Sequence, residues 1–316
     1  MKTAFLFPGQ GAKGTLEALA FAASEARGRE LLEMAAEASG VRVERMAARG
    51  GRELEKTEVL QPVLTAIGIF VAGELRAGGC PPDVVAGHSL GEIAASAAAG
   101  WLEPEDAVRI AALRGKLMAR EAAKRPGGLL AMETSDEGVI AEALERGRRV
   151  GSIAIGAINA PDEVVLTGDL SSLGAVAAAF PSKRLAVAGA WHSEAMLGAV
   201  EELRAALRES FRAAPESPSG VVSDRDGSLT LRGEDLIDRL AEQIALPVQW
   251  SRALGSLAEM GITDYVAIAP GAVLRGLLYK FHNNPGEPRP RVHSAEDRRD
   301  IDRALQSLRS LTRPED

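Results

Sequence analysis

Short apolar runs alternate with longer helical patterns over the first part of the chain. Thr3–Phe7 is an apolar run that stops at Pro8-Gly9-Gln10-Gly11, which predicts a short buried strand followed by a tight turn. Charged residues recur at helical spacing over Leu16–Glu37 and predict a first helix. Gln61–Leu75 predicts a second, apolar helix that is entered through Pro62.

A second strand, turn and helix follow directly. Asp83–Ala86 predicts a strand that runs into Gly87-His88-Ser89-Leu90-Gly91, and the small residues of Glu92–Ala99 predict a helix. A longer helix is predicted over Glu105–Ala123. Strands that alternate with helices indicate an α/β fold with a mostly parallel sheet.

The pattern changes between Gly127 and Gly189. Strands are predicted at Leu129–Thr134, Ser152–Ala157, Val164–Thr167 and Arg184–Val187, and helices at Glu137–Arg146 and Ser171–Phe180. This βαββαβ order is that of a ferredoxin-like domain. Because glycines stand at both ends and can act as hinges, we expect 127–189 to form a small domain inserted into a large one made of 1–126 and 190–316.

Larger elements return after the inserted segment. Helices are predicted at Glu194–Phe211, Gly233–Ile244, Ser251–Met260 and Val273–Tyr279, with strands at Val221–Ser223 and Asp264–Ile268. Asn283–Arg291 holds three prolines and is predicted to be a surface loop.

Composition narrows the class of protein. The 316 residues are 46% hydrophobic and 26% charged, which excludes a disordered, collagenous or coiled-coil chain. A net charge of −7 provides no overall positive field for nucleic acid or an anionic membrane. No stretch is expected to be long and apolar enough to span a membrane. With Cys80 alone, no internal disulfide or thiolate metal site can form, so we expect a reducing, cytoplasmic location.

Gly87-His88-Ser89-Leu90-Gly91 matches the nucleophile elbow G-x-S-x-G. In that motif a strained turn between strand and helix exposes a serine hydroxyl, and the helix N-terminus adds positive partial charge beneath a developing oxyanion. The alternative is an ordinary turn serine, but the strand before the motif and the small-residue helix after it favour the elbow.

A serine nucleophile needs a base, and the chain has four histidines. His88 lies within the elbow with its side chain expected to point away from Ser89, and His282 and His293 flank the proline-rich segment, where solvated loop positions are expected. His192 lies where the inserted domain rejoins the core. It is the candidate base, with a helix-capping or packed histidine as the alternative.

Two further positions could complete the chemistry. The Pro8–Gly11 turn could present an N–H beside the amide of Leu90 and so complete an oxyanion hole, or could simply be a tight turn in the core. Arg114 has only apolar neighbours three and four residues away along its helix. A guanidinium there needs a paired anion, which could be a substrate carboxylate, unless the side chain reaches solvent.

A series of motifs then occurs in a fixed order. They are Phe7–Gly11 (F-P-G-Q-G), Thr57–Pro62 (T-E-x-x-Q-P), Gly87–Glu92 (G-H-S-L-G-E), Arg114–Met118 (R-G-x-L-M), Asn159–Pro161 with Val164–Gly168, Trp191–Met196 (F-H-S-x-x-M in the family) and Gln243–Trp250 (Q-x-x-x-P-V-x-W). Over nearly its whole length the chain resembles the malonyl-CoA:acyl carrier protein transacylases and the related acyltransferases of polyketide synthases.

The resemblance implies a hydrolase-like α/β core with a ferredoxin-like small domain, and a role for each site residue. Those roles are Ser89 as nucleophile, His192 as base, the amides of Gln10 and Leu90 as oxyanion hole, Arg114 as the clamp for a malonyl carboxylate, Asn159 and Trp191 as substrate-binding residues, and the backbone carbonyl of Gln243 as the group that orients the base. No metal and no cofactor are implied.

Three positions depart from the family pattern. Trp191 stands where malonyl-selective members have phenylalanine and methylmalonyl-selective members commonly have a small residue. Its bulk argues against an α-branched acyl group. The glutamine that often follows the N-terminal loop is replaced by Lys13 or Gly14, and an acidic residue before the late G-P-G turn is replaced by Ala267.

We therefore expect a free-standing, monomeric enzyme of fatty acid or polyketide synthesis that passes malonyl from malonyl-CoA to acyl carrier protein through Ser89. Neither nucleic acid nor a membrane is an expected partner. The alternatives are a thioester hydrolase, transfer of a different acyl group, and a non-catalytic docking module for carrier protein. Because carrier proteins are acidic, basic residues near the mouth of the site are docking candidates: Lys183, Arg184, Arg275 and Lys280.

Overall fold

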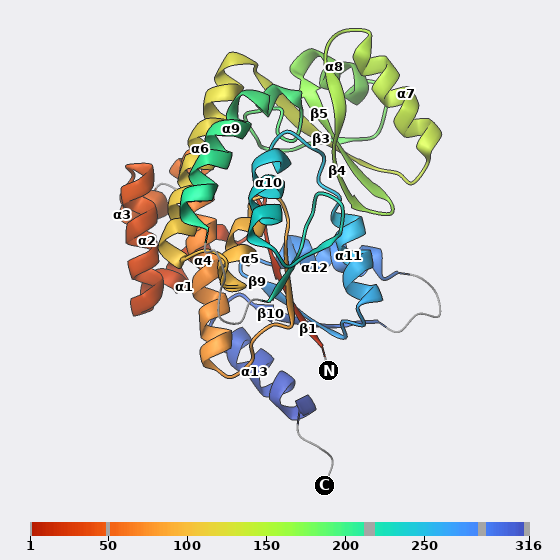
Figure 1. Cartoon of the computed structure of the whole chain (residues 1–316). Helices are drawn as coiled ribbons and strands as arrows, with labels where there is room; N and C mark the ends of the chain where they lie inside the picture. Colours follow the sequence, from red (N-terminus) through yellow and green to blue (C-terminus); the bar gives the residue numbers. More distant parts are fainter. Residues whose placement is uncertain (1, 49–50, 212–218, 284–288, 313–316) are drawn as a thin grey trace.

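Two separate sheets organise the chain in the computed structural model, which describes residues 2–48, 51–211, 219–283 and 289–312 (Figure 1). The larger sheet has the strand order β10 (Arg291–Ala295), β9 (Asp264–Ile268), β1 (Thr3–Phe7), β2 (Val84–Gly87), β7 (Gly220–Val222) and β8 (Leu229–Thr230). All neighbouring pairs are parallel except β7 and β8. The mostly parallel α/β core that the sequence predicts is confirmed.

Helices cover both faces of this sheet, and strand β1 shows how the sequence directs them. Side chains alternate across a strand, so Phe5 and Phe7 face one core while Ala4 and Leu6 face the other. The first core is covered by α1 (Thr15–Ser24), α2 (Ala26–Ser39), α3 (Val43–Ala47), η2 (Arg52–Glu55), α4 (Thr57–Ala77), α5 (Gly91–Ala98), α6 (Pro104–Lys124), η3 (Glu194–Met196), α9 (Leu197–Ser210), α10 (Gly233–Gln243) and α13 (Arg298–Thr312). The second is covered by α11 (Trp250–Glu259) and α12 (Ala272–Phe281).

The smaller sheet is antiparallel, with the order β4 (Ile153–Ala160), β5 (Glu163–Asp169), β3 (Gly127–Glu133) and β6 (Lys183–Arg184). Two helices, α7 (Glu137–Arg148) and α8 (Leu170–Ala177), pack on one face through Leu130, Leu166 and Leu173. The other face contributes Ala157 and Val165 to the core under α11 and α12. This strand order is the ferredoxin-like one, as predicted, and the proposed limits at residues 127 and 189 stay predictions.

The segment Leu16–Glu37, predicted as one helix, forms two. The chain is extended at Glu25, between α1 and α2. The break lets Leu19 of α1 and Leu31 of α2 reach the same buried core. Helical spacing of apolar residues continues through the break, so the pattern alone does not show it.

Helix α4 begins at Thr57, earlier than predicted, and contains Pro62 in its interior. It is also long and apolar enough to cross a membrane by length and composition, contrary to the expectation from the sequence that no stretch would be. However, 78% of the relevant window is buried inside the protein, against neighbours that include α2, α5 and α6. This burial is that of a core helix.

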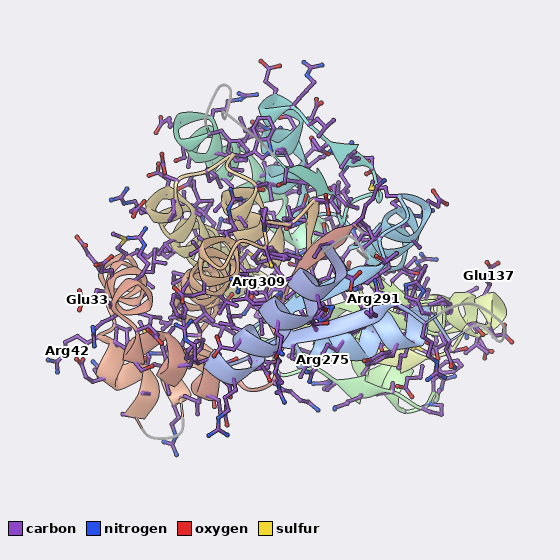
Figure 2. The ribbon with its side chains drawn as sticks, turned by 90° about the horizontal axis from the view of Figure 1, so that it is seen from below. Glu33, Arg42, Glu137, Arg275, Arg291 and Arg309 are labelled. Carbon is purple, nitrogen blue, oxygen red and sulfur yellow. The ribbon has the colours of Figure 1, made fainter. Side chains whose placement is uncertain are left out.

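Two elements near the C-terminus, strand β10 and helix α13, were not predicted from the sequence. Arg291, placed at the end of the predicted surface loop, begins edge strand β10, and its guanidinium pairs with buried Asp264. The chain then continues into α13, whose Arg309 donates to the carbonyl of Gly78. Figure 2 shows Arg291 and Arg309 on this side of the molecule. Residues 284–288 of the predicted loop lie outside the described residues.

Candidate active site

Ser89 lies on a strained turn between β2 and α5. Its φ is 51°, a left-handed backbone conformation that is rare for a residue with a side chain. The flanking glycines are needed for space: a Cβ at Gly87 would lie 2.1 Å from the N atom of Glu92, and a Cβ at Gly91 would lie 2.1 Å from the carbonyl oxygen of Phe7. The turn therefore has the geometry of a nucleophile elbow.

His192 reaches Ser89 across 103 positions of sequence. Its Nε2 lies 2.8 Å from Ser89 Oγ. Its Nδ1 lies 2.9 Å from the carbonyl oxygen of Gln243 and 3.2 Å from that of Leu246, at the C-terminal end of α10, where carbonyls lack partners within the helix. Because these carbonyls only accept hydrogen bonds, Nδ1 carries the proton and Nε2 is left to accept one from Ser89.

His192 is uncharged at neutral pH. Burial, followed by the positive charge of Arg114, lowers its pKa to about 4. The negative charge of Asp224 and the hydrogen bond to Gln243 act in the opposite direction. A neutral imidazole against a serine hydroxyl can take up its proton, which is what a general base requires.

Arg114 projects from α6 into the same site and is 1% exposed. Its guanidinium donates to Ser89 Oγ at 3.0 Å, to Gln61 Oε1 at 2.9 Å and to Gln243 Oε1 at 3.1 Å. All of these acceptors are uncharged oxygens, and among the described residues no ion pair with Arg114 is present. Burial lowers its pKa to about 10, so it stays positively charged at neutral pH.

The Pro8–Gly11 turn packs directly against the elbow. A Cβ on Gly9 would lie 2.5 Å from the carbonyl oxygen of His88, so only glycine allows this approach. The side chain of Gln10 accepts hydrogen bonds from Thr57 Oγ1 at 2.8 Å and Gln61 Nε2 at 3.2 Å, which fixes the turn. Within the described chain, the backbone N–H groups of Gln10 and Leu90 make no hydrogen bond.

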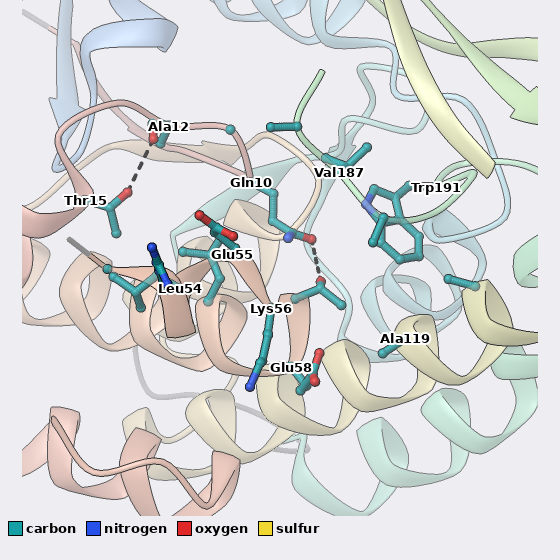
Figure 3. Close-up of a pocket in the computed structure, with 18 of the residues that line it drawn as sticks. Gln10, Ala12, Thr15, Leu54, Glu55, Lys56, Glu58, Ala119, Val187 and Trp191 are labelled. Carbon is teal, nitrogen blue, oxygen red and sulfur yellow. Dashed lines mark hydrogen bonds between the residues drawn. The ribbon is translucent and has the colours of Figure 1, made fainter. Parts of the chain in front are cut away.

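Ser89 and His192 open into a cavity of about 390 Å³ between the small sheet and α12. Asn159 lines it, with its side chain held by His88 Nε2 at 2.9 Å and by Glu163 Oε1 at 3.1 Å. Gln10 and Trp191 line this cavity and also a neighbouring one of about 860 Å³. Figure 3 shows the larger cavity, with Gln10 and Trp191 on its walls.

None of the other histidine side chains is hydrogen-bonded to Ser89 within the described residues, and two of them differ from their predicted surroundings. His88 points to Asn159. His293, predicted in a solvated loop, lies on β10 with Nε2 at 3.1 Å from Asp264 Oδ1. His282 ends α12 against the rings of Tyr265 and Phe281. The β10 strand explains the error at His293.

Three polar residues of the site received no role from the sequence. Gln61 belongs to the T-E-x-x-Q-P motif and Glu92 to the G-H-S-L-G-E motif, and these motifs are the sequence signal for both positions. Asp224, which accepts the N–H of Ser89 at 2.5 Å, follows a short strand and carries no local signal. Within the described residues, no cluster of three or more His, Cys, Asp or Glu side chains is arranged to hold a metal ion.

Comparison with known proteins shows the family to which the chain belongs. Residues 4–292 match the family described as the acyl transferase domain. The chain belongs to this acyl transferase family. The malonyl CoA-acyl carrier protein transacylase of Escherichia coli K12 is 32% identical over 286 residues, which cover 88% of this chain and 92% of that protein. The chain is therefore an acyltransferase.

Two further relatives extend the comparison. The polyketide synthase GfsB of Streptomyces halstedii is 36% identical over 239 residues, or 73% of this chain, although the match spans only 4% of that much longer protein. A solved structure described as a type II PKS acyl-carrier protein in complex with its malonyl-transacylase matches with a TM-score of 0.85 and 26% identity. The match covers 97% of this acyltransferase and 100% of that chain.

Proposed function

We propose that this acyltransferase moves a malonyl group from malonyl-CoA to the phosphopantetheine thiol of an acyl carrier protein through an ester on Ser89. The observation that carries the proposal is Arg114: a buried, charged guanidinium lies 3.0 Å from the Ser89 hydroxyl without a carboxylate partner. A substrate with a free carboxylate beside its thioester supplies that partner. The names of the related transacylases support the same substrate.

In the first half-reaction, His192 Nε2 takes the proton of Ser89 Oγ as the oxygen attacks the thioester carbonyl. The backbone N–H groups of Gln10 and Leu90 stabilise the tetrahedral oxyanion. The carbon–sulfur bond breaks, His192 returns the proton to the CoA sulfur, and a malonyl ester stays on Ser89. In the second, the carrier thiol loses its proton to His192 and its sulfur attacks the ester carbonyl. The ester carbon–oxygen bond breaks, and His192 returns the proton to Ser89 Oγ.

The proposal is tested by mixing the protein with malonyl-CoA and recording its intact mass before and after carrier protein is added. We expect a gain of one malonyl group that the carrier protein then removes and carries. Steady release of free malonate without carrier protein, at a rate equal to transfer, would instead favour the hydrolase. No adduct at all would favour a non-catalytic docking module, against which the Ser89–His192 contact argues.

The carrier protein is proposed to dock at the mouth of the catalytic cavity, in the cytoplasm. Lys183 and Arg184 line this cavity from exposed strand β6. Lys280 is occupied, because its ammonium pairs with Glu133 at 2.9 Å and Glu163 at 2.7 Å. Arg275 donates to Ser294. Arg184 also donates, to the carbonyl of Leu170 at 3.4 Å, but it and Lys183 lie on an exposed strand that lines the cavity, and they are therefore the better docking candidates of the four.

The rate of Ser89 acylation should stay almost constant from pH 7.5 down to pH 5.5. With a His192 pKa lowered to about 4, the imidazole is uncharged, and so able to accept a proton, throughout this range. With the ordinary value of about 6.5, the rate would drop roughly 10-fold over the same interval. Rapid-quench mass measurements at both pH values distinguish the two. A 10-fold drop would contradict the depressed pKa.

Replacing Trp191 with serine should raise acylation by α-branched malonyl thioesters relative to malonyl-CoA by about 10-fold, because one added methyl group in a tight pocket changes binding by this order. The indole lies against Gly189 and lines the catalytic cavity. Trp101→Ser is the matched control, since that indole is 4% exposed against 3% for Trp191 and does not line the cavity. An unchanged ratio of the two kcat/KM values would reject Trp191 as the residue that excludes branching.

A further inference from the structure

Two carboxyl groups are buried directly beneath the Ser89–His192 pair. Asp224 follows β7 and is 0% exposed, and Glu92 in the first turn of α5 is 1% exposed. Neither side chain forms an ion pair with a neighbouring Lys or Arg within the described chain. Buried carboxyl groups are costly unless they are hydrogen-bonded or needed.

Gln243 connects these carboxyl groups to the base. Its Nε2 donates to Glu92 Oε2 at 2.8 Å and to Asp224 Oδ1 at 3.0 Å, and its Oε1 accepts from Arg114. The backbone carbonyl of the same residue accepts from His192 Nδ1. Since every polar atom of the Gln243 side chain is engaged, the carboxyl groups hold in place the carbonyl that orients the imidazole.

Asp224 also holds the nucleophile itself. Its Oδ2 accepts the backbone N–H of Ser89, the residue with the left-handed φ of 51°. Asp224 therefore positions both members of the catalytic pair: it binds the backbone of Ser89 directly and reaches His192 through Gln243. The strained elbow conformation is held from outside, as such conformations generally must be.

Burial, and then the negative charge of Asp224, raise the pKa of Glu92 well above its ordinary value, which favours the protonated form of this carboxyl group. Each side-chain oxygen of Asp224 accepts one N–H group, Oδ2 from Ser89 and Oδ1 from Gln243. The charged and titratable groups that act on His192 are then Arg114, Asp224 and His88, with Glu92 behind Asp224.

We propose that Asp224 is the displaced acid of this site, a positioning residue that does through Gln243 what a directly bound carboxylate does in a serine–histidine–aspartate triad. When His192 takes the proton of Ser89 it becomes positive, beside the positive Arg114. The neutral backbone carbonyl of Gln243 cannot offset the positive charge on His192, whereas the buried carboxylate of Asp224, which contacts the Gln243 side chain, can. The inference rests on the proposed function, because Ser89 and His192 must be the reacting pair.

The experiment compares two carboxyl-to-amide variants at neighbouring buried positions. Asp224→Asn removes the negative charge of the side chain. It also replaces one acceptor oxygen with an NH₂ group, so one of the two N–H donors at this position loses its acceptor. Glu92→Gln replaces a neutral carboxylic acid with a neutral amide. The readouts are kcat and KM for malonyl-CoA acylation, the rate at which a neutral sulfonyl fluoride labels Ser89, and the thermal unfolding temperature. Asp226→Asn, at an exposed aspartate two residues away that pairs with Arg239, is the control.

We expect Asp224→Asn to lower kcat and the sulfonyl fluoride labelling rate by about 100-fold or more. The KM for malonyl-CoA should be unchanged or lower, because the positive charge of Arg114 is then no longer offset by a nearby carboxylate and attracts the malonyl carboxylate more strongly. Glu92→Gln keeps a neutral group that can still accept a hydrogen bond from Gln243, so we expect its losses in both rates to be smaller than those of Asp224→Asn by about tenfold or more.

Several results would overturn the inference: equal losses in both variants accompanied by equal falls in unfolding temperature, no loss in Asp224→Asn, or a loss confined to Glu92→Gln. The labelling rate keeps this test separate from the proposed function. If malonyl-CoA fails to load the wild type while the sulfonyl fluoride labels Ser89 in an Asp224-dependent way, the substrate assignment fails and the displaced acid stands.

Discussion

Replacing Ser89 with alanine should abolish the covalent malonyl adduct. The variant lacks the oxygen that lies 2.8 Å from His192 Nε2, so no ester can form there, and transfer to carrier protein should fall by about 10⁶-fold in kcat, as for other serine nucleophiles. Intact-mass measurement after mixing with malonyl-CoA gives the answer directly. The variant should keep its fold, because the hydroxyl is a small part of the buried site.

A buried serine in α5, the helix that follows the Ser89 turn, provides the control. Ser96 of α5 is 0% exposed, its hydroxyl donates to the backbone carbonyl of Glu92, and it does not line the catalytic cavity. Ser96→Ala should therefore load malonyl at nearly the wild-type rate. An adduct of equal size on Ser89→Ala would mean that another residue carries the acyl group, and the mechanism proposed for Ser89 and His192 would be wrong.

The sequence predicts the elbow well because its signals are local. Gly87 and Gly91 are required by contacts within a few residues of Ser89 or with the adjacent strand, and the strand and helix around them have ordinary patterns. Arg114 could also be predicted from the sequence, because a charged residue on an apolar helical stripe indicates a buried guanidinium. Both inferences need only spacing along one element.

Residues brought in from distant elements were harder to predict. The role of the Gln243 carbonyl came only through the family resemblance, because a backbone acceptor has no side-chain signature. Asp224 follows a three-residue strand and meets Ser89 across 135 positions. Nothing in the residues around it distinguishes it from a surface aspartate such as Asp226. Its burial depends on the packing of β7 beside β2, which only the assembled sheet defines.

The same limit explains the errors in the fold. Glu25 interrupts a continuous helical pattern because α2 must turn back onto α1, a demand of tertiary packing. Strand β10 lies beyond a proline-rich segment that signals a loop, and it is held at the sheet edge by the pairing of Arg291 and His293 with buried Asp264. These long-range contacts override local composition.

The acyl preference should depend on one guanidinium. Arg114→Ala is expected to lower kcat/KM for malonyl-CoA by about 100-fold or more, the cost of leaving a substrate carboxylate unpaired in a buried site. Acetyl-CoA, which has no carboxylate, should load Ser89 at the wild-type rate or faster, because removing the positive charge also favours the imidazolium that forms on His192.

Measuring both substrates by intact mass on the same preparation separates specificity from folding. A variant that merely unfolds loses acetyl and malonyl loading together, whereas a lost clamp reverses their order. Arg120→Ala is the matched control, since Arg120 lies on the same helix but pairs on the surface with Glu121 and Glu202. The ratio of malonyl to acetyl loading in Arg114→Lys should fall between those of the wild type and Arg114→Ala. Lysine keeps the positive charge but lacks the planar fork that holds a carboxylate through two hydrogen bonds. An unchanged ratio of malonyl to acetyl loading in Arg114→Ala would show that the buried guanidinium serves the protein structure and that selectivity for a diacid resides elsewhere.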